Sequence, residues 1–300
     1  MMEDEENKIE QEQDDEEEKG ERIRTKMAKL CLTQPLENTL NILTGPSQVG
    51  FQHPVTAPIR VAIIGTSGRQ EDLLELDTHM YDLMQQFSIY LIEHMFELLW
   101  TSVHLVSGGS AWCDHLAVRL YLENRIYGIQ PCHGLSLYLP CQFITSAQPQ
   151  HSQFEDTGQS DWNLNPGRTL NQLHHRFSQK IGRSTMHDIT CAHVLNAVLN
   201  TSQRGFHARN NEVAKCDYMI AFTWSHEATN VKEGGTQYTW NKCTQCLQKV
   251  HVPLPLLRQY GTTDQFELLM SLVHVESPSS NYSLVGDNVK QQKRKRAMTT

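Results

Sequence analysis

The sequence predicts an α/β fold: an open, mainly parallel sheet of about five strands, with helices on both faces and a helical insertion. Two observations predict it. Short apolar runs alternate with longer stretches of helical periodicity over residues 59–254, and glycine-rich turns connect them. A parallel neighbour in a sheet requires a crossover connection, for which a helix is the compact solution.

The first part of the sheet follows from strand, turn and helix in repeated order. Residues 59–64 form an apolar run that ends in Gly-Thr-Ser-Gly, and residues 103–106 end in Ser-Gly-Gly-Ser. Apolar residues recur every three or four positions over 73–100, which predicts an amphipathic helix. A second helix is expected over 111–127 and a third strand at 135–139.

The alternation stops after Pro140, where the chain becomes polar and rich in Asn, His and Gln. We expect residues 142–205 to be an insertion over the carboxyl edge of the sheet, where open α/β sheets bind ligands. The further elements are expected at the following positions: helices at 169–181 and 185–199, a strand at 218–222, a helix at 237–248, a strand at 250–254 and a cover helix at 263–273.

The two ends of the chain differ in charge from its centre. Residues 1–21 hold twelve acids and two lysines, so they carry a net charge of −10 in a chain whose total is −8. Like charges repel and cannot build a core, so we expect a disordered acidic head and linker at 1–54, a folded domain at 55–275 and a disordered basic tail at 276–300. The near-neutral domain does not require a strongly basic nucleic-acid surface.

The composition also bears on location. Eight cysteines in no dense framework, and an acidic start rather than a secretory signal, favour reduced thiols in an intracellular protein. No run of about 18 apolar residues occurs, so no membrane partner is expected. Lys293–Arg296 is a short basic run of the kind that nuclear import receptors bind, which predicts the nucleus; the alternative is a solvated tail on a cytoplasmic protein.

Three glycine-rich turns form the candidate ligand site. Glycine lets the backbone approach an anion, Ser and Thr hydroxyls add donors, and a helix N-terminus adds partial positive charge, so such turns can hold a phosphate. The alternative is that tight turns need glycine for their geometry alone. The candidate residues in and beside the turns are Gly65, Thr66, Ser67, Gly68, Arg69, Gly108, Gly109, Ser110, Gly234, Gly235 and Thr236.

Five motifs follow one another along residues 59–254: GTSGR, VSGGSAWCDHLAV, LSLYLPC, GFHARNNEVAKCDYMIAF and EGGTQYTW. In this order they resemble the SLOG superfamily of Rossmann-like nucleotide-binding proteins, which includes lonely-guy phosphoribohydrolases, DNA-processing-A-like proteins and uncharacterised phage and bacterial members. The resemblance implies a Rossmann-like fold and a nucleotide-type ligand. Members often form dimers through helices beside the sheet, so a homodimer is also expected.

The resemblance also implies roles for individual residues. Gly108, Gly109 and Ser110 match the turn on the phosphate side, and Asp114 matches an acid that caps or orients this turn. The loop of residues 234–236 matches a Gly-Gly-Thr loop that again faces phosphate.

Arg209 and Asn210 match a paired element whose guanidinium can hold a phosphate with two hydrogen bonds. The chain departs from the cytokinin-activating members at Tyr238, because those enzymes carry there a glutamate that serves in N-glycosidic cleavage. Glu212 and Glu233 are the candidate catalytic replacements. The alternative for both is a solvated or Arg-paired carboxylate.

The insertion carries residues that a spacer does not need. Trp162 lies in a turn, and His174 and Phe177 lie on the following helix, so aromatic groups are available to contact a base while Arg168 or Arg176 meets a phosphate. The alternative is that these side chains pack the insertion onto the sheet.

The sequence contains fifteen histidines and a single Cys-x-x-Cys pair, Cys243 and Cys246, on a predicted helix. A closed zinc site needs four ligands, and no second pair with recognised spacing follows. We therefore expect neither a bound metal nor a cofactor.

Three functions remain as alternatives. The first is binding of a nucleotide or nucleotide-derived metabolite by a sensor or sequestering protein. The second is hydrolysis of an N-glycosidic or phosphoribosyl bond in a nucleotide, against which the missing glutamate counts. The third is association with single-stranded nucleic acid, supported directly only by the basic tail. An acidic head and an import-like tail around a phage-like core also suggest a protein of a large DNA virus.

Overall fold

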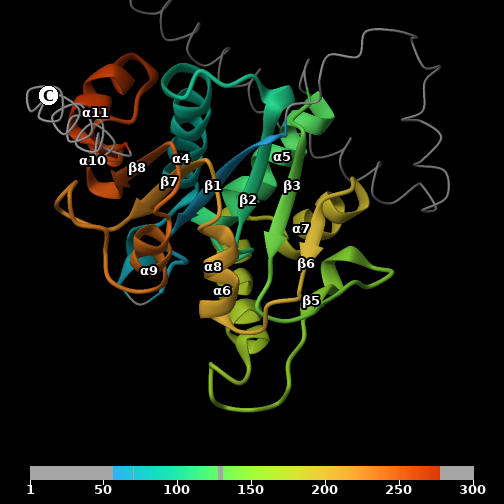
Figure 1. Ribbon diagram of the computed structural model, residues 1–300. Helices are drawn as coiled ribbons and strands as arrows, with labels where there is room; N and C mark the ends of the chain where they lie inside the picture. The colour runs from blue at the N-terminus through green and yellow to red at the C-terminus, as the bar shows by residue number, and fades with distance from the viewer. Residues whose placement is uncertain (1–56, 70, 128–130, 278–300) are drawn as a thin grey trace, which may run out of the picture. The chain divides into compact units, whose positions relative to one another are not determined.

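The computed structural model describes residues 57–69, 71–127 and 131–277, and it confirms the α/β fold. Its main sheet has seven strands in the order β6-β3-β2-β1-β7-β8-β9, two more than the sequence led us to expect (Figure 1). All neighbours pair in parallel except β8 and β9, which are antiparallel. The predicted head and the tail beyond residue 277, with Lys293–Arg296, lie outside the described residues.

The elements of the described chain have these bounds: β1 Ile59–Gly65, α3 Asp72–Glu75, α4 Thr78–Tyr90, a π-helical turn Leu91–Met95, a 3-10 turn Trp100–Ser102, β2 Val103–Ser107, α5 Cys113–Tyr127, β3 Gly134–Tyr138, β4 Phe143–Ile144, a 3-10 turn Pro149–His151, β5 Gln153–Phe154, α6 Pro166–Ile181, α7 Thr185–Val194, β6 Val198–Asn200, α8 Phe206–Val213, β7 Tyr218–Thr223, α9 Gly235–Lys242, β8 Gln248–Pro253, α10 Leu254–Tyr260, a 3-10 turn Thr263–Gln265, α11 Phe266–Leu272 and β9 His274–Glu276. Helix α10 was not predicted.

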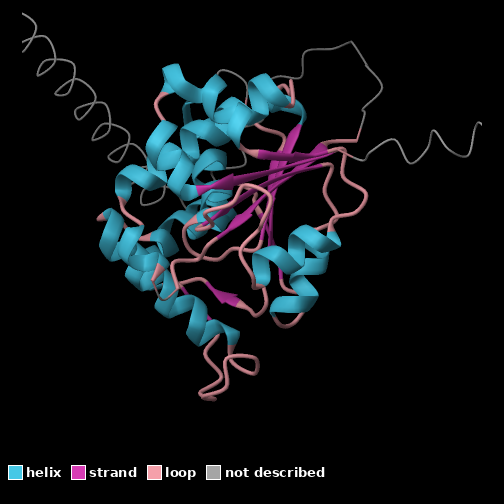
Figure 2. Cartoon of the chain, turned by 90° about the vertical axis from the view of Figure 1, so that its left-hand side faces the viewer, coloured by secondary structure: helices cyan, strands magenta, loops and turns pink. Residues whose placement is uncertain are grey.

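Helices cover both faces of the sheet, which a parallel sheet requires because its strands are apolar on both sides (Figure 2). Ala62 and Ile64 of β1 belong to one core cluster with Val213 of α8 and Trp240 of α9. The alternate β1 residues, including Ile63, point to the opposite face, where α5 contacts β1 and packs against α4.

The predicted helix over 73–100 is wrong in its extent. The chain is extended at Leu76, and α4 begins only after Asp77, whose side chain accepts a hydrogen bond from the backbone N–H of Met80 at 2.7 Å. Beyond α4 the helix continues as a π-helical turn. Glu97 then adopts a positive φ of 53°, which a helix cannot contain, so residues 98 and 99 lie outside any helix.

The predicted helices 185–199 and 237–248 are also too long. Asn196 has a φ of 72°, which ends α7 and lets the chain form β6, so the predicted insertion contributes an edge strand to the main sheet. Helix α9 ends at Lys242, and the Cys-x-x-Cys pair follows it rather than lying on it. Both cysteines are buried, and the Cys243 sulfur is 3.6 Å from that of Cys216.

Six of the described cysteines carry free thiols, as expected: Cys113, Cys132, Cys141, Cys216, Cys243 and Cys246. The expectation is wrong for Cys191 of α7, which is disulfide-bonded. Among the described helices, none is long and apolar enough to cross a membrane.

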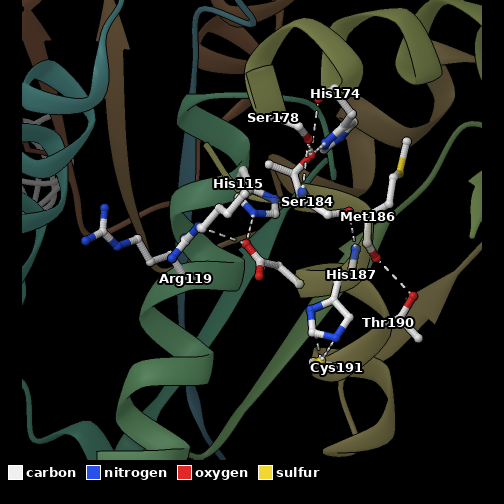
Figure 3. A network of polar contacts seen from close by, with 12 residues as sticks. His115, Arg119, His174, Ser178, Ser184, Met186, His187, Thr190 and Cys191 are labelled. Carbon is white, nitrogen blue, oxygen red and sulfur yellow. Dashed lines mark hydrogen bonds and ion pairs between the residues drawn. The ribbon is translucent and has the colours of Figure 1, made fainter. Parts of the chain in front are cut away.

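Two buried histidines fasten the insertion to the rest of the domain (Figure 3). His174 of α6 donates from Nε2 to the carbonyl of Gly109 at 3.1 Å, and its Nδ1 lies 2.9 Å from the Thr185 hydroxyl. His115 of α5 pairs with Asp188 of α7 at 3.1 Å. These contacts link the insertion to α5 and to the turn that precedes it.

We expect His174 to make the protein less stable in mild acid. Burial, with a smaller effect of His115, lowers the pKa of His174 to about 3, whereas a histidine in the unfolded chain titrates near 6.5. Between these values the unfolded state binds the extra proton. The free energy of unfolding should therefore fall as the pH drops below about 6.5, by at most about 1.4 kcal/mol per pH unit for this group.

Urea unfolding at pH values between 7 and 5 measures this contribution. The variant His174→Asn should show a shallower pH dependence than the wild type, even if it is less stable at pH 7. His175→Asn, on the exposed side of the same helix, is the matched control and should keep the wild-type slope. Equal slopes for His174→Asn and the wild type would contradict the prediction.

Candidate functional site

A pocket of about 370 Å³ lies at the carboxyl edge of the sheet, where β1 and β7 end. Within the sheet, β2 is the neighbour of β1 on one side, and β7, which comes much later in the sequence, is its neighbour on the other side. Such a change in strand order leaves a crevice between the loops that follow the two strands, and open α/β sheets bind ligands there. Gly65 and Thr223, the last residues of β1 and β7, both line the pocket.

Most of the predicted ligand-binding residues meet in this pocket. Gly68, Gly108 and Gly109 do not line it: an added Cβ would meet the Trp112 ring at Gly68, the Arg209 guanidinium at Gly108 and the Leu139 side chain at Gly109. The predicted residues that line the pocket are Gly65, Thr66, Ser67, Arg69, Ser110, Asp114, Arg209, Asn210, Gly234, Gly235 and Thr236.

Three helices begin at the pocket. The first turns of α5, α8 and α9 contribute Asp114, Arg209 and Thr236 respectively to its lining. The backbone N–H groups of a first helical turn have no partner within the helix, and the helix dipole adds partial positive charge at this end. The convergence of three such ends favours an anion in the pocket.

Arg209 is the central cation of the site, and its guanidinium is almost completely buried, with 8% of the residue exposed. It packs directly on Gly108, where an added Cβ atom would lie 1.2 Å from Nη1. Nη1 is 3.3 Å from Oδ2 of Asp114, while Nε is buried without a hydrogen-bond partner among the described residues. Burial lowers the pKa of Arg209, and the Asp114 carboxylate opposes this shift.

Asp114 connects Arg209 to the glycine-rich turn. Its Oδ2 atom also accepts a hydrogen bond from the backbone N–H of Ser110 at 3.2 Å. Burial raises the pKa of Asp114, and the charge of Arg209 acts in the opposite direction. The charge of Arg209 is the largest of the contacts that lower the pKa of Asp114 against the effect of burial.

Arg69 contributes a second guanidinium to the lining of the same pocket. The Cζ atoms of Arg69 and Arg209 each lie 5.9 Å from the centre of the Phe206 ring. Partial burial and the charge of Arg209 lower the pKa of Arg69. Among the described residues, no carboxylate lies within ion-pair distance of Arg69, so its charge repels that of Arg209 without a local counter-ion.

A third cation, Lys232, is already neutralised. Its Nζ atom is 2.6 Å from Oδ1 of Asp72, whose Oδ2 accepts a hydrogen bond from the Thr66 hydroxyl at 2.6 Å. This chain of contacts connects the loop before α9 to the turn after β1. The hydroxyl of Thr236 strengthens the same connection by donating to the carbonyl of Gly65 at 2.9 Å.

The two candidate catalytic glutamates occupy different places. Glu233 is exposed and lines the pocket. Glu212 lies on α8 outside the pocket lining and pairs with Lys215 at 2.7 Å. The hydroxyl of Tyr238, at the position of the missing motif glutamate, donates to Asn211 at 3.0 Å.

Of the insertion residues, only Trp162 lines the pocket. His174 and Phe177 are fully buried, and Arg168 pairs with Asp156 at 3.4 Å, so these three help to build the insertion. Arg176 is exposed and does not line the pocket either.

Sequence reasoning missed several lining residues, among them Asp72, Phe206, His207, Thr223, Lys232 and Thr239. Phe206, His207 and Thr239 lie within the motifs quoted above and Lys232 lies next to one of them, and that position was the available signal. Asp72 had none, because it reaches the site only through contacts with Thr66 and Lys232. Within the described chain, no group of three or more His, Cys, Asp or Glu side chains is arranged to hold a metal ion.

Comparison with known proteins identifies a viral relative. No protein-family model matches the chain. The uncharacterised protein R261 of Acanthamoeba polyphaga mimivirus is 36% identical over 187 residues, which cover 61% of this chain and 90% of that protein. A viral relative agrees with the suggestion of a viral protein drawn from the sequence.

We expect Gly108→Ala to displace Arg209 while the fold survives. The added Cβ would meet the end of a flexible side chain, so the guanidinium moves and the Asp114 pair breaks, at a cost of about 1–3 kcal/mol in stability. Gly65→Ala differs, because its Cβ would lie 2.1 Å from the backbone oxygen of Phe222, which cannot move freely.

Urea unfolding of both variants should therefore show a larger loss of stability for Gly65→Ala than for Gly108→Ala. Equal losses of stability in the two variants would contradict the prediction, because they would show that the Arg209 side chain yields no more readily than the backbone does.

Proposed function

The chain belongs to the same family as the uncharacterised mimivirus protein R261, and we propose that it binds a nucleotide, or a metabolite derived from one, through the ligand's phosphate. The observation that carries the proposal is that two arginines, Arg69 and Arg209, line one pocket, with a carboxylate partner for only one of them among the described residues. The protein would act as a sensor or as a sequestering protein for this ligand.

A phosphate is the group that best complements this arrangement. Its two negative charges at neutral pH remove the repulsion between the guanidiniums, and its oxygens accept several hydrogen bonds at once. One of these can come from Nε of Arg209, which is buried without a partner in the described chain. The free N–H groups at the starts of α8 and α9 supply further donors.

The pocket also supports the resemblance to the SLOG superfamily as part of the proposal. The turn residues and the Arg209–Asn210 pair that carry the resemblance come from four separate segments of the sequence, and all four contribute to one pocket. A nucleotide site at the carboxyl edge is the function that the resemblance implies.

Hydrolysis of a nucleotide is a second candidate, and the pocket carboxylates favour it. Glu233 and Asp72 line the pocket together with Asp114, so acidic groups stand beside the proposed phosphate site. Incubation of the full chain with adenosine 5′-monophosphate, followed by product analysis, separates the two functions. Release of adenine that Glu233→Gln abolishes would make the protein an enzyme, and intact nucleotide would leave it a binding protein.

We expect Arg69→Ala to weaken binding of adenosine 5′-monophosphate by roughly 10-fold to 100-fold, because a charge-assisted hydrogen bond contributes about 1.5–3 kcal/mol. Arg69 is exposed and has no ion-pair partner among the described residues, so its loss leaves no buried charge behind. Isothermal titration calorimetry of the full-length chain measures the change.

Arg176→Ala is the matched control, since it removes an exposed arginine outside the pocket, and it should bind like the wild type. Adenosine, which lacks the phosphate, should bind far more weakly than the monophosphate. Equal binding of the two, or wild-type affinity in Arg69→Ala, would contradict the proposal. Arg209→Ala is a poorer test, because it leaves Asp114 buried and unpaired, which costs about 3–5 kcal/mol in stability.

A further inference from the structure

We infer that Trp162 and Phe206 form a stacking surface for the base of the ligand, so that the pocket selects a nucleoside phosphate over a sugar phosphate or inorganic phosphate. This inference rests on the proposed function, because it takes the phosphate to lie at Arg69 and Arg209. It concerns the base, which is the part of the ligand that the arginines would not contact.

Two aromatic rings from distant parts of the sequence meet at this pocket. Trp162 comes from the insertion loop before α6, and Phe206 is the first residue of α8. Their ring centres are 5.8 Å apart, and the ring planes are inclined by 36°. Trp162 is 48% exposed, so part of its ring is available to a ligand.

The loop that carries Trp162 is anchored by a buried side chain. Asn165 is 1% exposed, and its Oδ1 accepts hydrogen bonds from the backbone N–H groups of Thr157 and Arg168. Its Nδ2 donates to Asp156 at 2.6 Å and to the carbonyl of Gln159 at 2.9 Å. The network closes the base of the loop and thereby limits the positions that Trp162 can reach.

The aromatic rings lie next to the proposed phosphate site. The centre of the Phe206 ring is 5.9 Å from Cζ of both arginines. A ligand with its phosphate at the guanidiniums therefore has its next groups beside Phe206 and Trp162, which is the order of phosphate, ribose and base in a nucleoside monophosphate. Ring stacking accepts every base, because each has a π-face.

Trp162→Ala tests the inference with two probes, adenosine 5′-monophosphate and ribose 5-phosphate. In the wild-type full-length chain the nucleotide should bind more tightly than the sugar phosphate. The variant should weaken nucleotide binding by roughly 5-fold to 100-fold, the usual worth of one stacked base, and change sugar phosphate binding by less than about twofold. Trp162→Phe should retain most of the affinity.

Leu164→Ala is the matched control, because this residue is exposed on the same loop but does not line the pocket. Equal affinity of the wild type for the two probes, or unchanged nucleotide binding in Trp162→Ala, overturns the stacking surface and leaves the phosphate site intact. Failure of the wild type to bind either probe at millimolar concentration overturns the proposed function, and the stacking inference with it.

Discussion

The Arg209 guanidinium is buried between the backbone of Gly108 and the carboxylate of Asp114, and this contact joins three parts of the site. Arg209 belongs to α8, Gly108 to the turn after β2 and Asp114 to the first turn of α5. Burying this cation with one nitrogen unpaired lowers the stability of the fold. Nε of Arg125 is also buried without a partner but lies outside the pocket lining, so it is the position of Arg209 in the pocket that makes its unpaired donor relevant to a ligand.

The topology of the sheet brings these parts together. In a parallel sheet every strand ends at the same edge, so turns that are distant in the sequence become neighbours there. The switch in strand order between β1 and β7 then opens the pocket between their loops. The insertion completes one side, since His174 ties α6 to the Gly109 carbonyl and Trp162 reaches the lining.

The core of the fold could be predicted from the sequence because its strands are continuous short apolar runs, the first of which, at residues 59–65, ends in glycine. The edge strands could not. Residues 198–200 and 274–276 are three-residue strands whose pairing, with β3 and β8, depends on tertiary contacts rather than local composition. Helix ends were missed where one residue with positive φ, Glu97 or Asn196, stops the helix without a glycine or proline to signal it.

The residues of the candidate site could be predicted where they lie in turns that are rich in glycine. The glycine-rich turn that contains Gly234 and Thr236 can be recognised in the sequence. Lys232 and Asp72 are 160 positions apart in the sequence and meet only in the folded chain. Glu233 lies in the turn before α9 and lines the pocket, whereas Glu212 lies on α8 outside the lining, and the sequence does not display this difference.

The most direct measurement is a crystal structure of the full-length chain grown with adenosine 5′-thiomonophosphate, in which the anomalous signal of sulfur marks the phosphorus-bound group. We predict that, apart from the peaks of the Met and Cys side chains, one sulfur peak of the ligand lies between the guanidiniums of Arg69 and Arg209, within hydrogen-bond distance of at least one of them. A ligand sulfur peak at any other place, or a bound nucleotide whose base occupies the arginine side of the pocket, would contradict the proposed phosphate site.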